Sequence, residues 1–155
     1  MKKIFFLLIP ILFTIFIVEF TLFIIKPNYI ELDKNLGWKL KSNFKYNYSK
    51  KNLNGEKYLV KFSTNHFGMR NFQTNLKGDS EINFFILGDS YTSDPYAGND
   101  KMWYSEIAKN IFNETGKQTS AYSLGAGGYG NLQQLLSLKE IKQNGFDFEK
   151  INIKK

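Results

Sequence analysis

The feature that most limits the fold lies in the second half of the chain, where short apolar runs alternate with segments of helical periodicity. Residues 84–87 (Phe-Phe-Ile-Leu) form a continuous apolar run ending at Gly88, which is typical of a strand buried on both faces. Apolar residues recur at helical spacing from Tyr104 to Phe112 and from Leu132 to Leu136. Weaker strand patterns follow, at residues 118–124 and 148–153. This alternation predicts an α/β domain with a parallel sheet.

Polar residues and glycines set the expected limits of the two helices. Asn99 or Asp100 can cap the first helix, which is expected to stop near Gly116. Asn131 can cap the second, which Gly145 ends.

A β-hairpin is predicted ahead of this alternation. Residues 44–48 alternate aromatic and polar side chains, as a half-buried strand does. Asn54-Gly55 is a strong tight-turn dipeptide, and apolar residues alternate again from Tyr58 to Phe62. We therefore expect a connector and hairpin over residues 26–82 and an α/β unit over residues 83–155.

The N-terminal segment has a different composition. After a three-residue tail (1–3), residues 4–25 are almost wholly Ile, Leu, Phe and Val, with Glu19 as the only charged side chain. One helix of this length would span the ~30 Å hydrocarbon core of a bilayer. A cleaved secretory signal is the alternative, but the apolar core is long for one and no small-residue cleavage site follows. We expect an uncleaved, single-pass transmembrane anchor in contact with the lipid bilayer, with the domain outside the cytoplasm, in the periplasm or at the cell surface of a bacterium.

Charge and cysteine content exclude several kinds of function. The net charge is +7, but the lysines are scattered along the chain and the sequence has no arginine-rich patch. We therefore interpret the charge as a composition bias and expect no nucleic-acid partner. With no cysteine, disulfide, thiol and zinc–thiolate chemistry are excluded. No metal or cofactor is expected.

The tripeptide Gly-Asp-Ser occurs twice, at residues 78–80 and 88–90. The first copy has no strand before it and is interpreted as a surface turn. The second follows the buried strand at its carboxyl end, which is where ligands bind in open α/β sheets. Ser90 can therefore present its hydroxyl group to a cleft. A plain strand-to-helix turn would give the same local pattern.

Four patches together resemble one enzyme family. Residues 85–92 (Phe-Ile-Leu-Gly-Asp-Ser-Tyr-Thr) resemble the first block of the SGNH hydrolases, the GDSL-type serine esterases. Residues 123–130 resemble their second block, Asn-x-Gly-x-x-Gly-Tyr, with Ser123 in place of the usual Asn. Residues 36–41 and 65–70 are similar to segments that precede the first block in one membrane-anchored branch. The patches occur in the family's order.

The resemblance implies a fold and a set of roles. The fold would be the N-terminal part of a flavodoxin-like, three-layer α/β/α domain with a parallel sheet. Ser90 would be the nucleophile that attacks an acyl-ester substrate, and its own N–H would help to hold the oxyanion. Gly128 would donate a second N–H to the oxyanion, since a glycine lets the backbone approach the substrate closely. Asp89 is interpreted as a brace for the turn, with a direct chemical role as the alternative.

The sequence does not show the base that a serine nucleophile needs. The family's Gly-x-Asn-Asp and Asp-x-x-His motifs normally follow the second block, and neither occurs before Lys155. The only histidine, His66, precedes Ser90 and is interpreted as an ordinary surface residue. Two interpretations stay open. One is a membrane-anchored serine hydrolase or acyltransferase acting on carboxylic esters of envelope glycans or lipids. The other is a catalytically inactive, membrane-tethered fragment.

A nucleotide-binding α/β domain is a more remote alternative. Residues 125–130 also fit Gly-x-Gly-x-x-Gly, and Asp147 follows at about the distance of a ribose-binding acid, ~20 residues. Asp147 precedes the next predicted strand rather than ending it, however. The strand before the glycines is also only weakly apolar. Both observations argue against this alternative.

Overall fold

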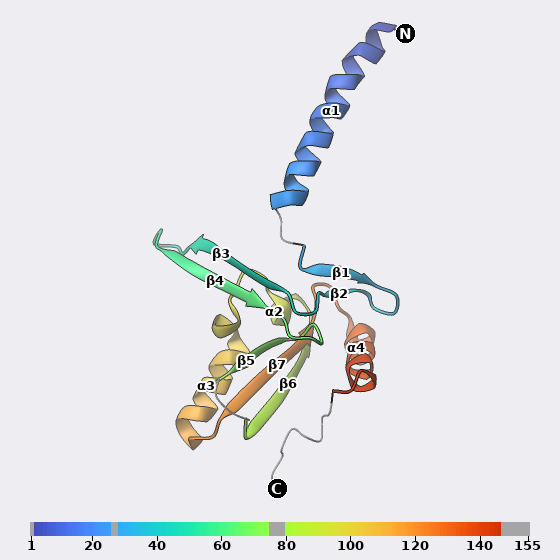
Figure 1. The fold of residues 1–155 in the computed structure, drawn as a ribbon. Coiled ribbons are helices and arrows are strands. Elements are labelled where there is room, and N and C mark those ends of the chain that lie inside the picture. The colour runs from blue at the N-terminus through green and yellow to red at the C-terminus, as the bar shows by residue number, and fades with distance from the viewer. Residues whose placement is uncertain (1, 26–27, 75–79, 147–155) are drawn as a thin grey trace.

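The computed structural model describes residues 2–25, 28–74 and 80–146, and in the first helix it describes side chains from residue 8 to residue 22. A long N-terminal helix precedes a domain of mixed helices and strands (Figure 1). The helices are α1 (Lys2–Ile25), α2 (Ser90–Ser93), the short 3₁₀ helix η1 (Asn99–Lys101), α3 (Trp103–Thr115) and α4 (Asn131–Gln143). The strands are β1 (Ile30–Asp33), β2 (Gly37–Leu40), β3 (Lys45–Lys51), β4 (Lys57–Ser63), β5 (Arg70–Gln73), β6 (Ile82–Gly88) and β7 (Thr119–Gly125).

The described strands form two antiparallel hairpins and one mixed sheet, so the expected parallel, flavodoxin-like sheet is wrong for this part of the chain. β1 pairs with β2 and β3 with β4, both antiparallel. The third sheet has the order β5-β7-β6, in which β7 is parallel to β6 but antiparallel to β5. β5 causes the difference, because it occupies the second edge of β7. The strand expected at residues 148–153, like Asp147, lies outside the described residues.

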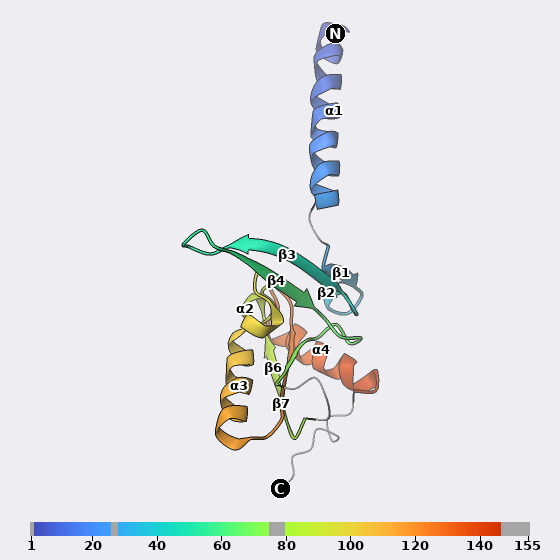
Figure 2. The same cartoon turned by 60° about the vertical axis from the view of Figure 1, so that its left-hand side comes forward.

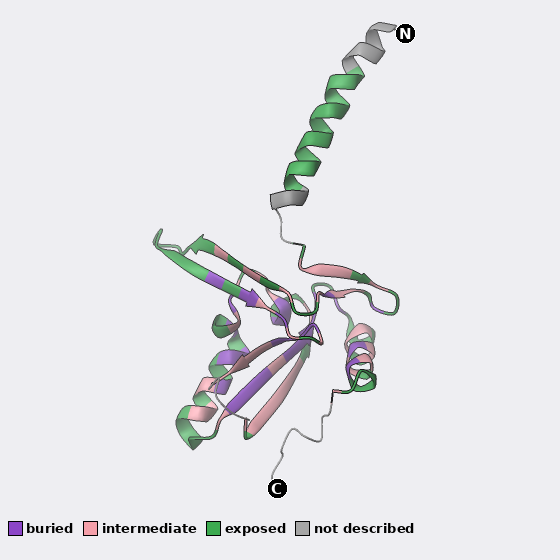
Figure 3. Ribbon diagram, viewed as in Figure 1, coloured by how far each residue is buried: buried purple, intermediate pink, exposed green. Residues whose placement is uncertain are grey.

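The burial of β6 and β7 is the reverse of what their sequences indicate. β6 was expected to be buried on both faces, yet its residues are mostly half-buried and Leu87 is exposed. Among the described strands, β6 pairs only with β7, so one of its edges carries no described neighbour. The weakly apolar β7 is the central strand, and six of its seven residues are buried (Figure 3). Small side chains such as those of Ser120 and Ala121 allow this close packing.

Helices α3 and α4 lie on opposite sides of the mixed sheet (Figure 2). Tyr104 and Ala108 of α3 pack on Ala121 of β7. Ile141 of α4 packs with Leu124, whose side chain points to the other face of the same strand. The sheet therefore has an apolar core on each face, as an α/β layer arrangement requires.

The predicted hairpin and both predicted helices are confirmed, with a shift at both helix starts, because none of Asn99, Asp100 and Asn131 is the capping residue. β3 and β4 pair over their full length around the Asn54-Gly55 turn. α3 ends with the left-handed Gly116, but it begins at Trp103 rather than directly after Asn99. The Asn99 side-chain oxygen, which a cap would use, is occupied elsewhere, since Oδ1 accepts hydrogen bonds from the Arg70 guanidinium group at 2.9 and 3.0 Å. α4 begins at Asn131, with Gly130 at the capping position.

The prediction of a transmembrane anchor is wrong for the described residues. Among the residues that the structure describes, no helix is long and apolar enough to cross a membrane. The predicted single-pass membrane location depended on this anchor and is wrong for the same reason.

Close packing between β6, α2 and β7 leaves no room for a side chain at Gly125. A Cβ atom built there would overlap the Gly88 carbonyl oxygen and the Thr92 hydroxyl group. Because one of these neighbours is backbone, we expect Gly125→Ala to lower the free energy of unfolding by ~3 kcal/mol, measured by urea denaturation. Gly130→Ala is the matched control, since its Cβ would meet only the end of a flexible Gln133 side chain at 3.4 Å. Equal losses for the two variants would contradict the packing described here.

Candidate active site

Ser90 lies where β6 ends and α2 begins, and it is exposed. The preceding residue, Asp89, caps the turn: its carboxylate accepts a hydrogen bond from the Tyr91 N–H at 3.0 Å. Its backbone carbonyl accepts from the Thr92 hydroxyl at 2.9 Å. Asp89 therefore has a bracing role in this structure, and the serine it supports is presented to solvent.

The turn that carries Ser90 is fixed to the centre of the sheet. The Ser123 hydroxyl of β7 donates to the Thr92 carbonyl of α2 at 2.8 Å, and Ser123 itself is buried. Ser123 stands at the motif position where Asn is usual. The hydroxyl group here has a structural role, since it links the turn that carries Ser90 to the neighbouring strand.

Ser90 lines a pocket of about 590 Å³. Gly127, in the loop between β7 and α4, lies beside it: a Cβ atom built on Gly127 would be 4.0 Å from the Ser90 Cβ. The structure thus brings the two motif segments together, although Ser90 and Gly127 are 37 positions apart in the sequence. The pocket is also lined by Tyr29, Tyr91, Ser93, Asp94, Pro95, Tyr96, Ala97, Lys101, Met102 and Trp103.

Gly128, the expected second oxyanion donor, occupies a tight turn next to this pocket. The Tyr129 N–H donates to the Ala126 carbonyl at 3.1 Å, and Gly128 has a φ of 83°. Gly127 is not among the residues of positive φ, so the turn is type II, which requires φ > 0 at its third residue. Gly128 is exposed, and its N–H donates to none of the described residues. This N–H is therefore available to a bound molecule.

One wall of the pocket is held by Arg70. This residue lies in the patch 65–70, but no role was predicted for its side chain. Its guanidinium group is fully buried and donates to the carbonyls of Asp94 at 2.5 Å and Ala97 at 2.7 Å. It also donates to Asn99 Oδ1 at 2.9 and 3.0 Å and lies 4.7 Å from the centre of the Phe62 ring. Burial lowers the pKa of Arg70. It is the single arginine of the chain, a signal that could have directed attention to it.

The other two candidate side chains lie away from the pocket lining. The Ser80 hydroxyl group hydrogen-bonds to the Ser120 hydroxyl group, and the rest of the first Gly-Asp-Ser copy falls outside the described residues. His66 is exposed and its ring packs on Phe67, with 3.9 Å between ring centres. Neither Ser80 nor His66 lines the Ser90 pocket.

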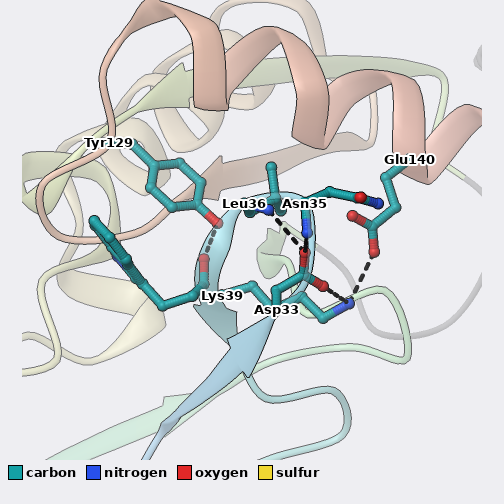
Figure 4. Close-up of polar contacts among 7 residues, drawn as sticks. Asp33, Asn35, Leu36, Lys39, Tyr129 and Glu140 are labelled. Atoms are coloured by element: carbon teal, nitrogen blue, oxygen red, sulfur yellow. Dashed lines mark hydrogen bonds and ion pairs between the residues drawn. The ribbon is translucent and has the colours of Figure 1, made fainter.

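A polar network joins the β1–β2 hairpin to the second motif segment and to α4 (Figure 4). Lys39 Nζ lies 2.8 Å from both Asp33 Oδ2 and Glu140 Oε1. The hydrogen bond to Asp33 raises the pKa of Lys39 and lowers the pKa of Asp33. The Tyr129 hydroxyl donates to the Trp38 carbonyl at 2.6 Å. Burial raises the pKa of Tyr129 to about 12, so its phenol is protonated at neutral pH and can donate.

Within the described ranges, no cluster of three or more His, Asp or Glu side chains could hold a metal ion. No protein-family model, curated protein or solved structure matches the chain. The resemblance to the SGNH hydrolases is therefore carried by the residues quoted above.

Proposed function

We propose that this chain carries the nucleophile and part of the oxyanion hole of an SGNH-type serine hydrolase or acyltransferase acting on carboxylic esters. The observation that supports the proposal most is the position of Ser90. It is exposed at the carboxyl end of β6, lines a pocket, and lies beside the Gly127–Gly128 turn that follows the parallel neighbour β7.

The proposed reaction begins when the Ser90 Oγ attacks the ester carbonyl carbon and loses its proton to a base. The carbonyl oxygen becomes an oxyanion, which accepts hydrogen bonds from the N–H groups of Ser90 and Gly128. Collapse of the tetrahedral intermediate breaks the bond to the alcohol oxygen, which leaves with a proton from the protonated base. Water then hydrolyses the acyl-Ser90 ester, or another alcohol accepts the acyl group.

The base is the part of this scheme that the described pocket does not provide. Its described lining contains one carboxylate, that of Asp94, and no histidine. The Asp94 carboxylate accepts from the Tyr96 N–H at 2.8 Å, and its backbone carbonyl accepts from Arg70. A non-catalytic role is therefore the competing function.

A rescue experiment separates the two functions. We expect the full chain to release p-nitrophenol from p-nitrophenyl acetate slowly, and added imidazole to raise the Ser90-dependent rate about tenfold or more, because a positioned base contributes ~10²–10⁴-fold. Ser90→Ala gives the background hydrolysis by imidazole alone. His66→Ala is expected to match the wild type, because His66 does not line the pocket.

Two results of this assay would go against the proposal as stated. If imidazole accelerates the wild type no more than Ser90→Ala, the non-catalytic function is favoured. If the wild type turns over strongly without imidazole and His66→Ala abolishes the turnover, then His66 supplies the base and its assignment as a surface residue is wrong.

A further inference from the structure

The peptide between Gly127 and Gly128 is held from one side by Trp38 of β2. The Trp38 Nε1–H donates to the Gly127 carbonyl oxygen at 2.9 Å. In a trans peptide the C=O and the following N–H point in opposite directions. The chain contains no cis peptide bond among its described residues. The bond from Trp38 therefore directs the Gly128 N–H away from β2.

The Gly127–Gly128 peptide could also take the opposite orientation, which would convert the type II turn into a type I turn. Types I and II differ by a flip of the central peptide, which here is the Gly127–Gly128 peptide. A glycine at position 128 can adopt the φ value of either type at little cost. In the flipped form the carbonyl oxygen would take the place of the N–H. A hydrogen bond to the carbonyl oxygen is thus what selects one form.

Trp38 is itself well fixed. Its ring packs on the Tyr129 ring, with 6.1 Å between their centres, and this packing does not require the Tyr129 hydroxyl group. On the other side, its Cζ2 atom would lie 3.4 Å from a Cβ atom built on Gly128. Trp38 does not line the Ser90 pocket, whereas Gly127 does. The indole ring therefore contacts the turn from outside the pocket.

We propose that Trp38 is a positioning residue for the oxyanion hole. Its indole N–H holds the Gly127–Gly128 peptide so that the Gly128 N–H is directed into the pocket beside Ser90, where the oxyanion forms. This inference rests on the proposed function for its catalytic consequence, but the peptide orientation can be tested without any reaction. A flipped peptide would direct a carbonyl oxygen at the developing negative charge and oppose the reaction.

Trp38→Phe tests the inference, with Tyr129→Phe as the matched control. Both variants keep an aromatic ring and lose one hydrogen bond between β2 and the turn, but only Trp38→Phe frees the Gly127 carbonyl oxygen. We expect Trp38→Phe to slow the acylation of Ser90 by p-nitrophenyl acetate in imidazole about tenfold or more, with KM unchanged, because losing one oxyanion donor costs ~10²–10³-fold. Tyr129→Phe is expected to stay within about twofold of the wild type at a similar thermal midpoint.

The amide resonance of Gly128 in protein made with isotope-labelled glycine gives the readout that needs no turnover. We expect one sharp resonance in the wild type and in Tyr129→Phe, and a doubled or exchange-broadened one in Trp38→Phe. A single unshifted resonance together with an unchanged acylation rate in Trp38→Phe would overturn the inference, as would equal slowing in the two variants. If the resonance doubles while Ser90 is never acylated in any variant, the orientation stands and it is the proposed function that fails.

Discussion

Replacing Arg70 with methionine is expected to lower the free energy of unfolding by ~3 kcal/mol. Methionine keeps an apolar chain against Phe62 but removes the guanidinium donors to the carbonyls of Asp94 and Ala97 and to Asn99 Oδ1. A hydrogen bond from a charged donor contributes ~1.5–3 kcal/mol, and a buried acceptor left without a partner costs ~1–3 kcal/mol. Part of this loss is offset because a buried charge no longer has to be desolvated.

Urea denaturation of Arg70→Met and of Lys117→Met measures this effect. Both changes remove one positive charge, but Lys117 is exposed, so its variant is expected to stay within ~0.5 kcal/mol of the wild type. Arg70→Lys should fall between the wild type and Arg70→Met, since an ammonium group keeps the charge without the planar fork. An Arg70→Met protein as stable as Lys117→Met would show that the carbonyls of the 94–97 loop do not need Arg70.

Local patterns predicted the local elements well. The β3–β4 hairpin follows from an alternating pattern on each side of Asn54-Gly55, and α3 ends at Gly116 because a glycine adopts the left-handed conformation there. These signals act over a few residues, so one sequence is enough to read them.

The arrangement of the sheet depended on contacts that no local pattern carries. β5 has the sequence Arg-Asn-Phe-Gln, which shows little apolar character, yet it pairs with β7 about 50 residues later. Its position makes the sheet mixed and makes β7 the buried centre. Strand order depends on which edges are free after all other segments have packed, and that information is spread over the whole chain.

The candidate site was predicted only as far as its sequence motifs reach. Ser90 and Gly128 follow from the two glycine-containing segments, whereas Trp38 and Arg70 act through partners that lie 89 and 24–29 residues away. Both residues lie in patches quoted from the sequence, 36–41 and 65–70. Their hydrogen bonds are made to backbone carbonyls or to an Asn side chain, however, and a single sequence does not show those partners.

Ser90→Ala is expected to abolish covalent labelling of the protein by a fluorophosphonate probe. Phosphonylation requires attack by a serine oxygen on phosphorus with loss of fluoride, and it forms an adduct whose phosphoryl oxygen lies where the proposed oxyanion would lie. Ser90 is exposed in the pocket next to Gly127, and its alanine variant keeps the turn, because the cap by Asp89 uses a different residue. The loss should therefore be complete, without loss of folding.

Ser80→Ala is the matched control, since Ser80 ends the other Gly-Asp-Ser copy and its hydroxyl group bonds to Ser120 rather than facing the pocket. The most direct measurement is the mass-spectrometric identification of the labelled peptide in the full chain, with imidazole present. We expect label on the peptide that contains Ser90, in the wild type and in Ser80→Ala, and no label in Ser90→Ala. Label on Ser80, or equal labelling of Ser90→Ala, would contradict this expectation.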